Sequence, residues 1–151
     1  DRLLQMLTQD RRPMLRRGLG LGLSLLSWAT REECWTELDG LVESADWELR
    51  RAGVLGLGTA WLATGHVRPI RRLLRLKAQE MRAEVGCAVG ISLGLILAGR
   101  GDQETALLEG LCRSHSHMER YGAVTGLGLA GAGSGSRRLL RLLASVLAED
   151  S

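Results

Sequence analysis

Several residue types are scarce in this sequence, and each scarcity limits what the protein can be. Phenylalanine is absent, aromatic residues make up only 3% of the 151 residues, and proline occurs twice. Apolar residues still reach 45%, so the chain can bury a core, but aliphatic side chains and four tryptophans have to fill it. Seventeen acidic residues are mixed among 20 basic ones without aromatic residues placed for base stacking. We therefore predict no nucleic-acid binding.

Cysteines and long apolar runs are also scarce. Cys34, Cys87 and Cys112 are odd in number and far apart, which argues against a disulfide framework and favours a reducing compartment. The uncharged run at 85–99 is shorter than the roughly twenty residues that cross a membrane, so we predict a helix buried by protein and no membrane association. The sequence begins at Asp1 without a signal-peptide pattern, and we interpret it as a piece of a longer chain.

Glycine, by contrast, is abundant, with twenty residues. Four segments share one frame, at 16–22, 50–56, 84–90 and 120–126. In this frame a small residue recurs at 18, 52, 86 and 122, and a glycine recurs at 22, 56, 90 and 126. Another small residue, serine or glycine, follows two positions later. The period of about 35 residues is typical of stacked helical pairs.

The periodicity of apolar residues between these segments predicts the helices. We expect glycine-rich helices at 15–29, 48–64, 82–98 and 118–132, and amphipathic helices at 32–44, 68–79, 102–112 and 136–149, with residues 2–8 ending an earlier unit. Gly65, Gly99 and Gly135 are expected to stop the glycine-rich helices. The predicted fold class is all-α, a two-layered α-solenoid or toroid fragment of helical pairs. Its units are predicted at about 14–47, 48–81, 82–116 and 117–151.

Glycines inside helices predict close contacts between helices. Each costs about 1 kcal/mol relative to alanine, and backbones that pack tightly against a flat helix face can offset this through dispersion contacts. We therefore expect each glycine-rich helix to lie between neighbours, with its amphipathic partner facing outward. The predicted structural glycine stripe consists of Gly18, Gly22, Gly56, Gly58, Gly86, Gly90, Gly122, Gly126 and Gly128.

The clearest copy of the frame, RYGAVTGLGLAGAGSG at 120–135, resembles the proteasome/cyclosome (PC) repeat, and the resemblance extends over essentially the whole chain. Within this family the order of LRRAG at 49–53, TG at 64–65 and IRRLL at 70–74 is most similar to the larger repeat-bearing non-ATPase subunits in the base of the proteasome regulatory particle. The copy at 82–99 departs from the pattern, because Glu84 and Val85 replace the usual Arg-Arg or Arg-Tyr.

The resemblance implies a closed ring of such units with a non-catalytic scaffold role in the degradation of ubiquitinated proteins. The partners it implies are the proteasomal ATPases, other non-ATPase subunits and a ubiquitin receptor, in the cytoplasm and nucleus, with no cofactor. Two alternatives stay open. One is the PC-repeat scaffold of the anaphase-promoting complex, which is a ubiquitin ligase, and the other is a generic helical-repeat adaptor.

Three patterns could carry chemistry in principle. GLGLAG at 126–131 matches the dinucleotide fingerprint, but that motif needs a strand before it, and the repeat frame places it inside a helix. Cys112, His115 and His117 lie close together, but their spacing is not that of a zinc site, and we expect Cys112 on the apolar side of a helix end. The acidic residues are expected on solvated faces. We predict no catalytic, cofactor-binding or metal-binding residues, no small-molecule substrate, and no enzyme activity.

Arginine clusters are the remaining candidates for function. Arg71, Arg72 and Arg75 lie on the polar face of one amphipathic helix, where they form a possible surface for an acidic partner. The alternative is ion pairing inside the chain, with Glu80, Glu84 and Glu119. The same sequence, RRLLR, recurs at 137–141, out of step with the repeat, and is interpreted as a compositional coincidence.

Overall fold

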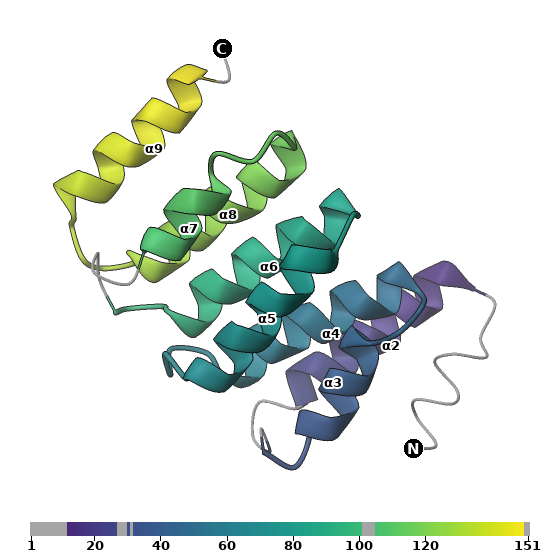
Figure 1. Ribbon diagram of the computed structural model, residues 1–151. Helices are drawn as coiled ribbons and strands as arrows, with labels where there is room; N and C mark the ends of the chain where they lie inside the picture. Colours follow the sequence, from purple (N-terminus) through teal and green to yellow (C-terminus); the bar gives the residue numbers. More distant parts are fainter. Residues whose placement is uncertain (1–11, 27–29, 31, 101–104, 150–151) are drawn as a thin grey trace.

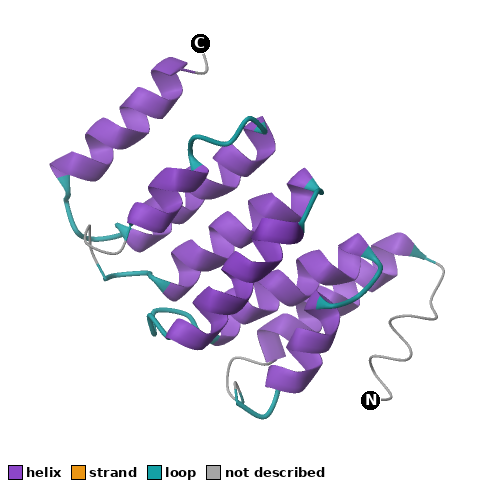
Figure 2. Ribbon diagram, in the orientation of Figure 1, coloured by secondary structure: helices purple, strands orange, loops and turns teal. Residues whose placement is uncertain are grey.

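The computed structural model describes residues 12–26, 30, 32–100 and 105–149. These residues form eight α-helices and no strand (Figure 2). The glycine-rich helices are α2 (Pro13–Leu26), α4 (Trp47–Ala60), α6 (Ala83–Ile96) and α8 (His117–Ala130). The amphipathic helices are α3 (Trp35–Val42), α5 (Val67–Gln79), α7 (Ala106–Leu111) and α9 (Arg137–Glu149). The all-α fold is therefore confirmed. The predicted residues 2–8 lie outside the described residues.

The helices stack in two layers (Figure 1). In one layer α6 lies between α4 and α8, and α2 packs against the other side of α4. In the second layer α3 packs against α4, α5 against α6, and α7 against α8. Each of these amphipathic helices thus contacts chiefly the glycine-rich helix that follows it in the chain. Helices α2 and α9 lie at opposite ends of the stack.

The helix ends follow from local hydrogen bonding. Asp46 caps α4 by accepting a hydrogen bond from the Glu48 N–H at 2.8 Å, a favoured use of aspartate at this position. Gly65 and Gly99 stand in the left-handed region, with φ of 61° and 73°, which glycine adopts without a steric cost. The Gly65 N–H also donates to the Ile96 carbonyl at 2.9 Å, so the turn after α4 satisfies a free carbonyl at the end of α6.

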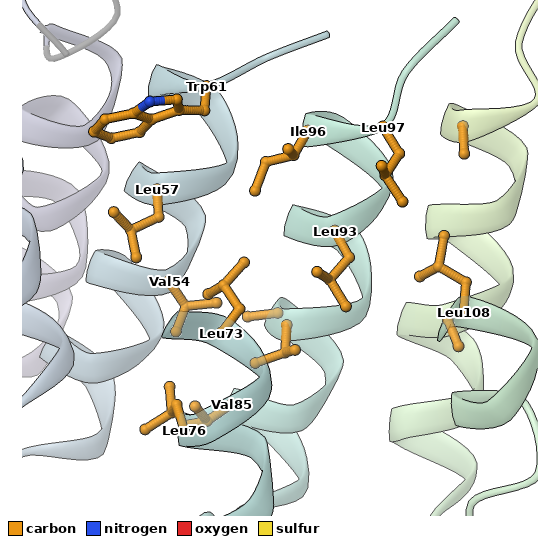
Figure 3. Close-up of a cluster of buried hydrophobic side chains, with 14 of the residues drawn as sticks. Val54, Leu57, Trp61, Leu73, Leu76, Val85, Leu93, Ile96, Leu97 and Leu108 are labelled. Atoms are coloured by element: carbon orange, nitrogen blue, oxygen red, sulfur yellow. The ribbon is translucent and has the colours of Figure 1, made fainter. Parts of the chain in front are cut away.

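The core runs continuously along the interface between the layers (Figure 3). Helix α6 supplies its centre, because Val85, Leu93 and Ile96 have no exposed surface. Each neighbouring amphipathic helix inserts a fully buried leucine, Leu38 from α3, Leu73 from α5 and Leu108 from α7. Residues 85–96 of the uncharged run thus lie in a helix that is largely buried by protein, as predicted. The described part of the chain contains no helix able to cross a membrane.

Candidate functional site

The closest helix contacts are made by glycines of α6 and α8. A Cβ atom on Gly90 would lie closer than 3.0 Å to the backbone of Gly122, and a Cβ on Gly94 would meet the backbone of Gly126 equally closely. No side chain fits at such distances, because the backbones themselves are in contact. Glycine is therefore required at the interface between these two helices.

Other glycines of the predicted stripe pack chiefly against side chains. The neighbours are Leu38 and Ser24 at Gly56, and Glu119 at Gly86. Side chains can shift where backbone cannot, so we expect Gly56 and Gly86 to tolerate substitution better than the glycines between α6 and α8. Gly58 is intermediate, because it meets both the side chain and the Cα atom of Ser92. The sequence pattern did not distinguish these kinds of contact.

Three glycines of the predicted stripe have open space beside them, namely Gly18, Gly22 and Gly128. Apart from the adjoining residues and backbone of their own helices, no heavy atom of the described residues lies within 4 Å of the place that their Cβ atoms would take. Conversely, three helical glycines outside the predicted set pack closely against a neighbouring helix, namely Gly20, Gly53 and Gly94. The sequence frame missed them because their positions do not carry a small residue in all four copies.

Two buried serines join the glycine-rich helices, and sequence reasoning treated them only as small residues. Ser24 Oγ of α2 donates to the Ala52 carbonyl of α4 at 3.0 Å, and Ser92 Oγ of α6 donates to the Val54 carbonyl of α4 at 2.9 Å. Both serines are at most 1% exposed. A buried hydroxyl needs such a partner, so the serines add directional bonds between helices that otherwise meet through glycine.

The arginine at the start of the frame also has a structural role that the sequence did not reveal. Arg50 donates to the carbonyls of residues 44 and 45 at 2.9 and 3.0 Å, and Arg120 donates to those of residues 114 and 115 at 2.9 and 3.1 Å. These carbonyls follow the ends of α3 and α7, where intrahelical partners are lacking. The third copy has Glu84 at this position, so it lacks such a donor.

Arg50 additionally holds a nearly buried carboxylate. Arg50 Nε donates to Glu80 at 2.8 Å, and the Glu80 side chain is 5% exposed. Burial by itself raises the pKa of Glu80, but the hydrogen bonds from Arg50 and from the N–H groups of Arg82 and Met81, with the charge of Arg50, outweigh it. The net effect is a pKa below the ordinary value for glutamate.

A pH-dependent stability follows from this shift. Because the Glu80 pKa is lower in the folded state than in the unfolded state, its contribution is present above about pH 4.3 and is lost as pH falls through the folded pKa. We expect Glu80→Gln to destabilise the protein more at pH 7 than at pH 3 in urea unfolding. Glu33→Gln, at an exposed position, controls for the loss of one charge. An equal loss for Glu80→Gln at both pH values would contradict this assignment.

The arginines of the predicted partner surface line a groove between α3 and α5. This basic groove has a volume of about 790 Å³ and is lined by Arg68, Arg71, Arg72 and Arg75 of α5 and by Trp35 and Asp39 of α3, among others. Arg72 forms ion pairs with Asp39 and Glu43, and its side chain is only 16% exposed. Arg71 and Arg75 are exposed. Of the three predicted surface arginines, Arg72 is therefore paired within the chain, whereas Arg71 and Arg75 are exposed.

The ion-pair partners that the sequence suggested for these arginines need correction. Glu80 pairs with Arg50 instead, and Glu119 pairs with Lys77 at 2.9 Å. Sequence proximity suggested partners that follow along the chain. The actual partners of Arg72 come from α3 and the residue after it, one repeat earlier, because stacking places equivalent helices side by side.

The interpretation of the second RRLLR segment as a coincidence is also wrong. Arg138 of α9 donates to Thr105 Oγ1 at 3.4 Å and to Glu109 of α7 at 2.6 Å. These contacts span 33 and 29 residues, as do those from Arg72 to Asp39 and Glu43. The two segments therefore make equivalent ties to the amphipathic helix one repeat earlier.

The residues that the sequence offered for metal binding or nucleophilic chemistry are not brought together into one site. Cys112 is buried at the end of α7, whereas His115 and His117 are exposed. Burial, with a contribution from the Glu109 charge, raises the pKa of the Cys112 thiol, and burial raises that of Cys87. A raised pKa makes a thiol a poorer nucleophile at neutral pH. The described residues contain no group of three potential metal ligands, and residues 126–130 lie within α8.

Comparisons with known proteins identify relatives of the chain, although no family model matches it. It is 32% identical over 134 residues to the 26S proteasome non-ATPase regulatory subunit 1 of Drosophila melanogaster, covering 89% of the chain and 13% of that protein. It is 30% identical over 151 residues to the 26S proteasome regulatory subunit rpn2 of Schizosaccharomyces pombe, covering 100% and 16%. Identity to the Dictyostelium discoideum subunit 1 is 28%, over 89% of the chain and 14% of that protein. The chain thus spans 13–16% of the length of these relatives.

Proposed function

Because this chain is homologous over most of its length to 26S proteasome regulatory subunits of the non-ATPase subunit 1 and Rpn2 type, we propose that it is part of a non-catalytic scaffold in the base of the regulatory particle. The observation that carries the proposal is the alignment of all 151 residues with the rpn2 subunit of S. pombe at 30% identity. In this role the chain organises ATPase and ubiquitin-receptor subunits for the degradation of ubiquitinated proteins in the cytoplasm and nucleus.

The arrangement of the helices supports a scaffold role. Helices α4, α6 and α8 pack side by side, and glycines and serines bring them into close contact. Interhelical hydrogen bonds from Ser24 and Ser92 add directional contacts to this layer. A stack of this kind holds its outer surfaces at constant spacing, which suits a protein that positions other subunits.

The open glycines support a longer stack. In the interior of the chain, Gly122 and Gly126 of α8 contact α6, which is the preceding glycine-rich helix. Gly58 of α4 also contacts α6, which is the glycine-rich helix that follows α4. Gly18 and Gly22 of α2 occupy the frame positions of the first two, and Gly128 of α8 occupies that of Gly58. Further units, stacked before α2 and after α8, would cover all three positions. The units at 14–47, 48–81, 82–116 and 117–151 are then part of a longer series.

Exposed leucines at the ends of the stack support the same continuation. Leu25 and Leu26 of α2 are 68% and 77% exposed, and Leu140 of α9 is 63% exposed. Large apolar side chains in such positions are commonly covered by a neighbouring surface. The relatives are several times longer than the chain, which is consistent with additional units there.

The experiment that tests the proposed function is affinity purification of the tagged full-length protein from its own cells, followed by mass spectrometry. We expect recovery of the proteasomal ATPases, other non-ATPase subunits and the core particle. Recovery of cullin-like and RING ligase subunits would instead assign the protein to the cyclosome. Recovery of neither set, from cells in which both complexes are intact, would favour a generic helical-repeat adaptor. Each of the last two results overturns the proposal.

A further inference from the structure

The charges of the basic groove are not balanced within the chain. Its two acidic residues, Asp39 and Glu43, both pair with Arg72. Arg68 pairs at 3.2 Å with Glu32, whose side chain is 63% exposed, and an exposed pair of this kind is weak and exchangeable. Arg71 and Arg75 take part in no ion pair between described residues. The groove therefore carries an excess of positive charge, concentrated on two exposed guanidinium groups.

The wall of the groove opposite these charges is ordered by aromatic contacts. The Arg68 guanidinium lies 3.8 Å from the centroid of the Trp35 ring, a favourable cation–π distance. The Trp35 ring in turn meets the buried Trp61 ring edge to face, with centroids 5.3 Å apart. Because one face of Trp35 is covered by Arg68 and the ring is fixed by Trp61, it is a poor platform for stacking a nucleobase. This favours a protein ligand over a nucleic acid.

The spacing of the two exposed arginines matches an extended acidic chain. Arg71 and Arg75 are four residues apart on α5, which places side chains about 5–6 Å apart on one helix face. Alternate residues of an extended chain are about 6.6 Å apart and point the same way. Two carboxylates at positions i and i+2 of such a chain can therefore each reach one guanidinium, and arginine binds carboxylate through paired hydrogen bonds.

We propose that the basic groove between α3 and α5 binds an extended acidic segment of a partner protein, with Arg71 and Arg75 holding carboxylates at alternate positions. Val67, which is 54% exposed at the rim, adds an apolar contact beside the charges. The inference rests on the proposed scaffold function, because it supplies the chemistry of one partner contact. Of the three arginines predicted to form a partner surface, only Arg71 and Arg75 then bind the partner, because Arg72 forms ion pairs within the chain.

The chain offers a matched control for this site. Arg137 and Arg141 of α9 stand in the same relation to Arg138 as Arg71 and Arg75 stand to Arg72, and both are exposed. Replacing Arg137 and Arg141 by alanine removes the same charge from the same kind of helix without altering the basic groove. A difference between the two double variants therefore reports on the groove and not on net charge.

The test is a titration of purified full-length protein with a fluorescent twelve-residue peptide of alternating aspartate and serine, followed by anisotropy. We expect salt-sensitive binding that the Arg71→Ala/Arg75→Ala variant weakens about tenfold, which corresponds to about 1.4 kcal/mol. Arg137→Ala/Arg141→Ala should weaken it less than about threefold, since distant surface charges are screened. A peptide with asparagine in place of aspartate should not bind.

A charge exchange provides a second test. The Arg71→Glu/Arg75→Glu variant should lose the aspartate peptide and gain binding of the corresponding lysine peptide. Equal losses in the two alanine variants, or tighter binding of oligodeoxythymidine of equal charge than of the peptide, would overturn the proposal. The titration uses no other subunit, so a negative result leaves the scaffold function standing. Conversely, failure to recover proteasome subunits by affinity purification does not affect the titration.

Discussion

Replacing Gly126 by alanine is expected to destabilise the protein by about 2–3 kcal/mol, in the upper part of the range of about 1–3 kcal/mol found for overpacked cores. The added methyl group would meet the Gly90 carbonyl oxygen and Leu108 Cδ2, both closer than 3.0 Å. Backbone cannot move aside there without separating α6 from α8. Alanine also favours a helix over glycine by about 1 kcal/mol, so the expected net loss implies a larger packing penalty.

Gly40→Ala is the matched control for this prediction. Gly40 also lies inside a helix, α3, but it is exposed. Apart from the adjoining residues and backbone of α3, no heavy atom of the described residues lies within 4 Å of the position that an added methyl group would take. Alanine should therefore stabilise the protein by up to about 1 kcal/mol. Urea unfolding followed by circular dichroism measures both variants. If the two variants change the free energy of unfolding in the same direction, the glycine contacts between α6 and α8 are not as close as described.

Replacing Trp61 by alanine is expected to cost about 3–5 kcal/mol, as is usual for a large buried aromatic residue. Trp61 directly follows α4, is 1% exposed, and packs edge to face on Trp35 of α3. Its removal leaves a cavity between the two layers and frees the Trp35 ring. A loss of the near-ultraviolet circular dichroism signal should accompany the loss of stability.

Leu62→Ala serves as the control for Trp61→Ala, because Leu62 is the next residue and is 39% exposed. We expect a loss below about 1 kcal/mol for this change, since a partly exposed side chain contributes less burial. Thermal or urea unfolding distinguishes the two variants readily. Similar losses for both would mean that Trp61 is not the anchor between α3 and α4.

The helices and their repeat could be predicted because both depend on local signals. Apolar spacing, capping residues and the recurrence of glycine all depend on short stretches of chain, and the predicted helices are found within a few residues of those expected ends that the structure describes. The expected ends at residues 29 and 102 lie outside the described residues. Gly65 and Gly99 adopt left-handed backbone conformations in the links after α4 and α6, but both helices end before these glycines. The turn at 61–63 ended α4 earlier than the apolar pattern indicated.

The contacts of the arginines could not be predicted in the same way. Arg72 and Arg138 belong to identical RRLLR segments that fall one helical turn short of the spacing of two repeats. Their partners at α3 and α7 shift by the same amount, so both contacts recur although the repeat frame appears broken. The ion pair with Glu43 recurs with Glu109, and a hydrogen bond to the neutral Thr105 replaces the ion pair with Asp39. Comparing the repeats along the sequence shows only that the RRLLR segments are out of step with the repeat. The stacked helices show that the arginine and its partners are displaced along the sequence by the same number of residues.

The sequence by itself determined the fold class, the repeat and the kinship of this protein, because helical periodicity and recurring glycines are properties of the chain before it folds. Only the tertiary structure decided which glycines carry the packing and which arginines remain available. Gly126 and Gly128 lie two residues apart on α8 and face different directions, so a Cβ atom on the first would meet the backbone of α6, whereas none of the described atoms beyond α8 lies within 4 Å of the Cβ position of the second. Such differences depend on what the neighbouring helices bring to each face, and long-range packing is not encoded at any single position.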